Sequence, residues 1–208
     1  MLLRPILLTT LVSIMMTSCI GLKSKPDTTK TYALGLSDPV QDNSVKTAKR
    51  GYLARPQFPV YMEGNTLKML SKDGEILALP NARWAEPIDT GIARTVSHFI
   101  ALSNNDLKSD FYPWVRDENP AFTIKLSFHH LIATQDGRIL ISANWICNYA
   151  DGEVKQGLFA DDTIEWSPKD AQSMVNGINK ALNLLAKDIA STLGSSSSSS
   201  APTSALQM

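Results

Sequence analysis

Residues 121–159 read AFTIKLSFHHLIATQDGRILISANWICNYADGEVKQGLF, and this stretch decides the fold. Apolar and polar residues alternate along its first part, which is the period of a half-buried β-strand. The apolar members of that alternation are Phe122, Ile124, Leu126 and Phe128. Asp136-Gly137 and Asp151-Gly152 are typical hairpin turn sequences, so the stretch predicts three antiparallel strands joined as a meander.

The two turns also predict how the strands are aligned. A two-residue loop at the first turn pairs Gln135 with Arg138 and brings apolar residues opposite one another. The expected pairs are Phe128 with Trp145, Leu126 with Cys147 and Ile124 with Tyr149. A two-residue loop at the second turn places Leu158 opposite Trp145. We therefore expect Phe128, Trp145 and Leu158 to form one row, buried against the last helix of the chain.

That last helix follows the meander directly. Ser167 is the expected N-cap, Pro168 fits the first helical position, and Asp170 favours the positive end of the helix dipole. An apolar stripe broad enough to cover a sheet then repeats at helical spacing. Its members are Met174, Val175, Ile178, Ala181, Leu182, Leu185, Ala186, Ile189 and Leu193.

A second helix and several short strands are expected before the meander. The helix spans residues 87–102, where Pro87 begins a run with apolar residues at helical spacing. Segments with β character lie at residues 31–36, 45–50, 57–63, 66–70 and 75–79. Together these elements predict one α/β domain, with a mixed, largely antiparallel sheet and two long helices packed on it.

Composition argues against nucleic acid as a partner. The chain of 208 residues has 20 basic and 20 acidic residues, so it carries no net positive charge that would attract phosphates. It also contains neither a P-loop nor a GxSxG nucleophile motif. Of its two cysteines, Cys147 lies in an apolar run, which favours a buried thiol over one paired with another chain.

Few residues suggest chemistry. His129-His130 is the pair that invites a metal-binding interpretation, but consecutive strand residues point to opposite faces and cannot readily chelate one ion. Asp161-Asp162 could be a catalytic carboxylate pair, although adjacent acids of this kind are more often a solvated turn. We therefore predict a protein that is not an enzyme, with no catalytic, cofactor-binding or metal site.

A set of methionine and aromatic residues leaves two interpretations open. They could form an apolar surface that grips lipid tails or a partner protein, or they could be core residues, which the sequence favours for each one singly. The set is Met62, Met69, Trp84, Tyr112, Trp114 and Trp166.

The two ends of the chain predict its location. Residues 1–18 have the basic, apolar and small-residue regions of a signal peptide, and Cys19 follows where a bacterial lipoprotein receives its lipid. Residues 19–29 are then a lipidated flexible tether, residues 30–194 the folded domain, and residues 195–208 a Ser-rich disordered tail. By the sorting rules of enterobacterial lipoproteins, Ile20 rather than Asp at the next position favours the outer membrane.

Four short segments resemble the ABC-type transport auxiliary lipoproteins, a family that includes the PqiC-like outer-membrane lipoproteins. They are Tyr32-Ala33-Leu34, Tyr52-Leu53-Ala54-Arg55-Pro56-Gln57, Arg83-Trp84-Ala85-Glu86-Pro87 and Ser142-Ala143-Asn144-Trp145. With the C-terminal helix they cover most of residues 30–193 in the order of the family. The Trp-Ala-Glu-Pro segment is the most specific of them.

The resemblance implies an anticodon-binding-domain-like α/β fold and no catalytic residue. It also implies a periplasm-facing, outer-membrane accessory component of an MCE/ABC-type system that moves lipid between membranes. Its partners would be an MCE-domain tunnel protein and the inner-membrane transporter, and a matching ring of copies of this chain would present many weak contacts. The alternatives are a structural lipoprotein that docks an envelope assembly without handling lipid and, with least support from the residues, an envelope hydrolase.

Overall fold

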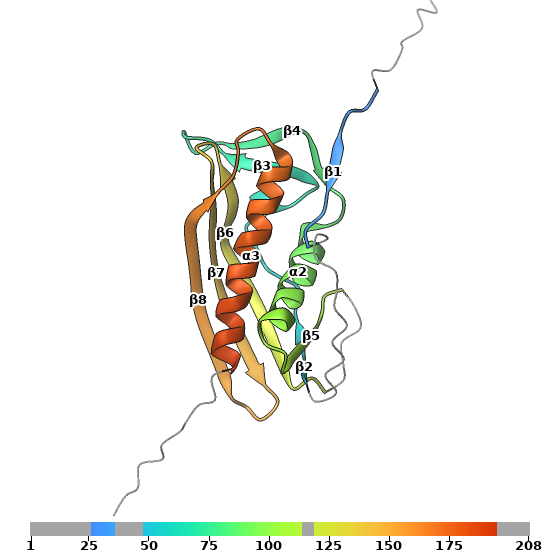
Figure 1. The fold of residues 1–208 in the computed structure, drawn as a ribbon, viewed down its shortest axis with the longest axis vertical. Helices are drawn as coiled ribbons and strands as arrows, with labels where there is room; N and C mark the ends of the chain where they lie inside the picture. Colours follow the sequence, from blue (N-terminus) through green and yellow to red (C-terminus); the bar gives the residue numbers. More distant parts are fainter. Residues whose placement is uncertain (1–25, 36–47, 114–118, 195–208) are drawn as a thin grey trace, which may run out of the picture.

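Three long strands form the predicted meander, which makes up one side of the sheet (Figure 1). They are β6 (Phe122–Thr134), β7 (Arg138–Tyr149) and β8 (Val154–Glu165). The structure is a computed structural model that describes residues 26–35, 48–113 and 119–194. The predicted signal peptide, Cys19 and the Ser-rich tail lie outside the described residues.

The predicted strand alignment is wrong at the first turn. Residues 135–137 make a three-residue loop, in which the Gly137 N–H donates to the Thr134 carbonyl and Gly137 has φ +94°. A glycine in that left-handed conformation ends a common three-residue hairpin loop. The longer loop shifts the pairing by one residue, and a bulge between Phe128 and His130 shifts it by one more. Leu126 therefore lies opposite Trp145, and the apolar faces still match because the total shift is two residues.

The second turn moves Leu158 away from the predicted row. Residues 150–152 again form a three-residue loop, with Gly152 at φ +93° and the Tyr149 N–H donating to the Glu153 carbonyl. A shift of one residue reverses the faces of a strand. Gly157 lies opposite Trp145, and Leu158 is 66% exposed on the other face of the sheet. Phe128 and Trp145 are buried as predicted.

The other five strands form two short branches along the side of β6 that does not pair with β7. One branch contains β2 (Lys49–Leu53) and β5 (Leu107–Phe111), and the other contains β3 (Thr66–Leu70), β4 (Ile76–Trp84) and β1 (Lys30–Tyr32). Within the described ranges the sheet has eight strands. Antiparallel pairing is confined to β3–β4, β6–β7 and β7–β8, and the other pairs are parallel. The sheet is therefore mixed, as predicted.

Several predicted strand boundaries change. The segment predicted at residues 57–63 forms one isolated bridge, Gln57 to Ser127, and the 3-10 helix η1 (Val60–Met62). Pro56 and Pro59 have no N–H for a strand ladder, which explains the interruption. Residues 45–47 of the predicted strand lie outside the described residues, and β5 was not predicted at all.

Both predicted helices are present and cover one face of the sheet (Figure 1). They are α2 (Ile88–Ser103) and α3 (Ala171–Gly194). The N-cap of α3 is Asp170 rather than Ser167, because the Asp170 Oδ1 accepts the N–H groups of Gln172 and Ser173 at 3.0 and 3.3 Å. The outcome is one α/β domain with two helices on a mixed sheet.

Cys147 lies on the helix-covered face of β7 and is fully buried, as predicted. Burial, which disfavours the charged thiolate, raises the pKa of Cys147 to about 12.

We expect the Cys147 thiol to be unreactive in the native protein. Iodoacetamide reacts with thiolates, and this thiol is both inaccessible and protonated at pH 8. Intact-protein mass spectrometry should detect no alkylation of Cys147 at pH 8 without denaturant and complete alkylation in guanidinium chloride. Modification of the native protein at the rate of a free thiol would contradict the buried position of β7.

Candidate docking site at the start of helix α2

Three of the four family-resembling segments meet where α2 begins. The Ala85 N–H donates to the Tyr32 carbonyl at 2.8 Å, and the parallel strands β1 and β4 pair Tyr32 with Trp84. The chain after Tyr32 also contacts α3, where the Gly35 N–H donates to the Asn179 Oδ1 at 3.0 Å. The fourth segment, residues 142–145, lies in β7 and contributes to the core instead.

A bidentate ion pair joins the elements that meet at this junction. Arg94, on α2, donates through both terminal nitrogens to the Glu86 carboxylate, and its Nη2 also donates to the Leu34 carbonyl at 2.7 Å. The hydrogen bond to Glu86 raises the pKa of Arg94, so the guanidinium stays charged. Arg94 thereby connects α2, the segment before it and the end of β1.

Arg55 is an exposed cation at this junction. Its Nε donates to the Asp89 Oδ2 at 2.9 Å, and its guanidinium carbon lies 5.3 Å from the centre of the Tyr112 ring. The Arg55 side chain is 66% exposed whereas that of Asp89 is 7% exposed, so a buried carboxylate holds a solvent-facing cation. Asp89 is itself held by the Thr90 N–H at 2.8 Å. Because its side chain is already held in one conformation, such an arginine can contact an acidic or aromatic group of a partner with little further loss of conformational entropy.

Arg55 lies in one of the family-resembling segments, but the sequence does not identify it as a functional candidate. The pairing with Asp89 joins residues 34 positions apart, so no local pattern predicts it. The sequence does place Asp89 in the first turn of a predicted helix. Acidic residues are common there, however, because they interact favourably with the helix dipole.

Three members of the methionine and aromatic set lie in the core of the described part of the chain and not on its surface. Met62, Trp84 and Trp166 are buried, and Trp114 lies outside the described residues. Met62 and Trp84 line a small apolar cavity together with Met174 and Ile178 of α3. Its volume of about 30 Å³ is far too small for an acyl chain and matches the space of a single water. The core interpretation therefore holds for these three residues.

The histidine pair lies at an irregularity of β6. The register shifts between Phe128 and His130, and both His129 and His130 are exposed. Within residues 26–35, 48–113 and 119–194, no group of three or more His, Cys, Asp or Glu side chains could hold a metal ion.

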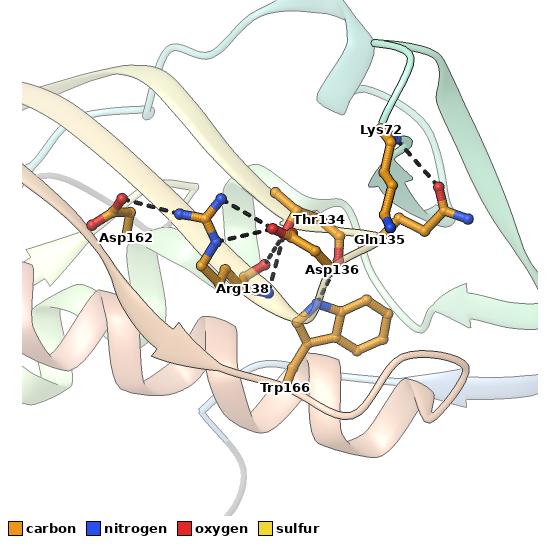
Figure 2. Close-up of polar contacts among 7 residues, drawn as sticks. All are labelled: Lys72, Thr134, Gln135, Asp136, Arg138, Asp162 and Trp166. Carbon is orange, nitrogen blue, oxygen red and sulfur yellow. Dashed lines mark hydrogen bonds and ion pairs between the residues drawn. The ribbon is translucent and has the colours of Figure 1, made fainter.

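The acidic pair Asp161-Asp162 lies within β8 and not in a turn. Figure 2 shows the Asp162 carboxylate paired with Arg138 at 3.3 Å, and Arg138 paired in turn with Asp136 at 3.1 Å. Asp136 accepts the Thr134 hydroxyl, and this bond is the main cause of its lowered pKa. The network holds the β6–β7 turn in place and leaves Asp162 in a structural ion pair.

Two further hydrogen bonds hold the same turn. The Trp166 Nε1 donates to the Thr134 carbonyl at 2.9 Å, and the Lys72 N–H donates to the Gln135 Oε1 at 3.2 Å (Figure 2). The turn is thus connected by hydrogen bonds both to the segment before α3 and to the β3–β4 connection.

Among the described helices, none is long and apolar enough to cross a membrane.

Solved structures of other proteins are similar to this one to different degrees. A crystal structure of an uncharacterized protein matches with a TM-score of 0.61 at 16% identity, over 70% of this chain and 92% of that chain. Protein XCC0632 from Xanthomonas campestris, of the DUF330 family, matches with a TM-score of 0.54 at 12% identity, over 79% and 91% of the two chains. A PelC dodecamer from Paraburkholderia phytofirmans matches with a TM-score of only 0.42 at 9% identity, over 72% and 90%.

The search of curated proteins finds no match. A family model, however, matches residues 32–190, which include every segment that meets at the start of α2. The chain therefore belongs to the family of ABC-type transport auxiliary lipoprotein components.

Proposed function

We propose that this protein is a non-catalytic accessory component of an MCE/ABC-type system that transports lipid between membranes. The observation that carries the proposal is the family match over residues 32–190. On this proposal the protein is anchored in the outer membrane, faces the periplasm and contacts an MCE-domain tunnel protein linked to an inner-membrane transporter. It also associates with copies of itself, since a ring would match a ring-shaped partner with many weak contacts.

The anchor in this proposal is a lipid on Cys19. Residues 19–29 then separate the lipid from β1, and a flexible tether of that length has an end-to-end distance of about 18 Å. Two or more acyl chains suffice for stable attachment, so the domain would stay at the membrane surface without spanning it.

We expect mature protein to begin at a lipidated Cys19. Mass spectrometry of the N-terminal peptide should give Cys19 with acyl chains and no trace of residues 1–18. Cys19→Ser should give an uncleaved precursor or a protein released from the outer-membrane fraction. Cleavage at another position, or an unmodified Cys19, would refute the lipidation proposal.

The exposed guanidinium of Arg55 is our candidate contact for the MCE-domain partner. We expect Arg55→Gln to weaken co-purification of that partner from envelopes at least tenfold, because one fixed cation of an interface is lost. Arg50→Gln is the matched control, since Arg50 lies on β2 shortly before Arg55, is 60% exposed and pairs with the acidic side chain of Asp110. Equal recovery of the partner with both variants, each with a native-like Tm, would exclude Arg55 as the contact.

Lipid transport and structural docking can be separated by two measurements on a deletion strain. Transport predicts that an MCE-domain protein co-purifies with the wild type and that deletion alters outer-membrane lipid asymmetry and detergent resistance. Co-purification without either defect would favour the structural lipoprotein. An absent partner together with an unchanged membrane would end the transport proposal.

A further inference from the structure

Helices α2 and α3 pack side by side on the sheet (Figure 1). Residues that follow β1 fill one end of the groove between them. A Cβ placed on Gly91 of α2 would lie 3.6 Å from the Leu34 Cβ, and one placed on Gly35 would lie 2.5 Å from the Thr95 Oγ1. Gly35 also contacts α3, where its N–H donates to the Asn179 Oδ1 at 3.0 Å. This short segment therefore lies against both helices.

The two helices hold the segment by its main chain. The Leu34 carbonyl accepts a hydrogen bond from the Arg94 Nη2 of α2 at 2.7 Å, and the Gly35 N–H is the group bound by Asn179 of α3. Hydrogen bonds of this kind hold a peptide backbone whatever its sequence, and the neighbouring side-chain contacts provide specificity. This end of the groove thus holds a short stretch of polypeptide.

A hollow of about 420 Å³ lies between α2 and α3 closer to their C-terminal ends. Residues four positions apart are neighbours on the surface of a helix. Asn183 therefore lies next to Asn179 along α3, and Lys187 lies next to Asn183. The residues around the hollow are Phe99, Leu102 and Ser103 of α2 with Asn183, Lys187 and Ser191 of α3.

The lining of this α2–α3 hollow is apolar on one side and cationic on the other. On α2, Phe99 is buried and Leu102 is 51% exposed. On α3, Lys187 is exposed, and within the part of the chain that the structure describes it forms no ion pair. None of the lining residues is acidic. The hollow therefore favours an occupant that carries a negative charge beside an apolar group.

Asn183 adds a group that can bind a peptide backbone. Its buried Oδ1 makes no hydrogen bond within residues 26–35, 48–113 and 119–194, a cost in free energy that a peptide N–H would remove. The equivalent oxygen of Asn179, one turn earlier, already holds the Gly35 N–H. Ser103 and Ser191 make the lining still more polar. This polarity favours a peptide over an acyl chain, which needs a mostly apolar site.

We propose that the α2–α3 hollow binds a peptide segment of a partner protein that carries an acidic and an apolar side chain. The apolar side chain packs on Leu102, the carboxylate pairs with Lys187, and Asn183 binds the main chain. The hollow is a contact separate from Arg55, beyond the proposed function and independent of lipid transport.

A defined peptide tests the role of Lys187. The probe is a short fluorescein-labelled peptide in which glutamate and leucine alternate, compared with one in which lysine replaces glutamate. Full-length protein in non-ionic detergent should bind the glutamate peptide about tenfold more tightly by fluorescence anisotropy, with protein-free micelles as the blank. Lys187→Glu should abolish this preference, whereas Lys180→Glu, which changes an exposed lysine of α3 outside the hollow, should keep it.

A thiol in the hollow tests where the peptide binds. Leu102→Cys introduces an accessible cysteine, since Cys147 is buried and Cys19 is the expected lipid site. Iodoacetamide should modify this cysteine readily in the free protein and much more slowly in the presence of saturating glutamate peptide. Val60→Cys is the control, because Val60 is 76% exposed on η1 and should react equally with and without peptide.

Two results would overturn the peptide site, provided that each variant keeps a native-like Tm. An equal charge preference in Lys187→Glu and Lys180→Glu would show that the hollow does not select the acidic peptide. Protection of the Leu102→Cys thiol without peptide would show that the chain itself covers the hollow. Peptide binding at the hollow in a protein that captures no MCE-domain partner would support this site and count against the proposed function instead.

Discussion

Trp145→Ala is expected to lower the free energy of unfolding by about 3–5 kcal/mol. The Trp145 side chain is 1% exposed in the core between the sheet and α3. Its Nε1 donates to the Asp188 Oδ2 of α3 at 3.1 Å, so alanine leaves both a cavity and a carboxylate without this donor. Chemical denaturation followed by circular dichroism measures the change.

Trp145→Phe separates the two contributions. Phenylalanine keeps much of the apolar volume but cannot donate to Asp188, so its cost should be clearly smaller than that of alanine. The buried position would be contradicted if Trp145→Ala lowered the free energy of unfolding by less than about 1 kcal/mol, since core Trp deletions cost several times that amount.

Gly51→Ala is expected to destabilise the protein by about 1–3 kcal/mol or more. Gly51 on β2 pairs with Phe122 on β6, and a Cβ at position 51 would lie 2.1 Å from the Phe122 Cε2. Phe122 is fully buried and cannot move aside without disturbing the core. Denaturant titration of the variant against the wild type gives the magnitude.

The cause of that destabilisation can be tested by removing the ring. In a Phe122→Ala background the added methyl has room, so Gly51→Ala should then cost little or become stabilising. An equal cost in both backgrounds would show that backbone effects, rather than the contact with Phe122, determine the requirement for glycine.

The periodicity of the chain predicted the elements well because each pattern is local. Alternation over residues 122–128 and the helical stripe from Met174 to Leu193 each report which face an element buries. The lipoprotein family could likewise be predicted, because short segments around Trp84 and Arg55 retain its pattern. What these segments do could not be predicted, since the contact of Arg55 with Asp89 joins different elements.

The strand alignment shows the limit of local reasoning. Asp-Gly predicts a two-residue turn, but the same dipeptide also ends a three-residue loop, and the two loops differ in strand register by one residue. At the first turn the bulge at His129 restored the apolar match, so the error was hidden. At the second turn nothing restored it before Trp145, and Leu158 moved from the core to the exposed edge.

The sequence by itself therefore determined the class of fold, the meander, both helices and the family. Only the tertiary structure decided which residues face each other and where Arg55 is held. The physical reason is that burial patterns repeat every two or 3.6 residues and constrain single elements. Alignment between elements depends on loop conformation and on side chains distant in the chain, such as the Trp145 ring, which occupies the space beside Gly157.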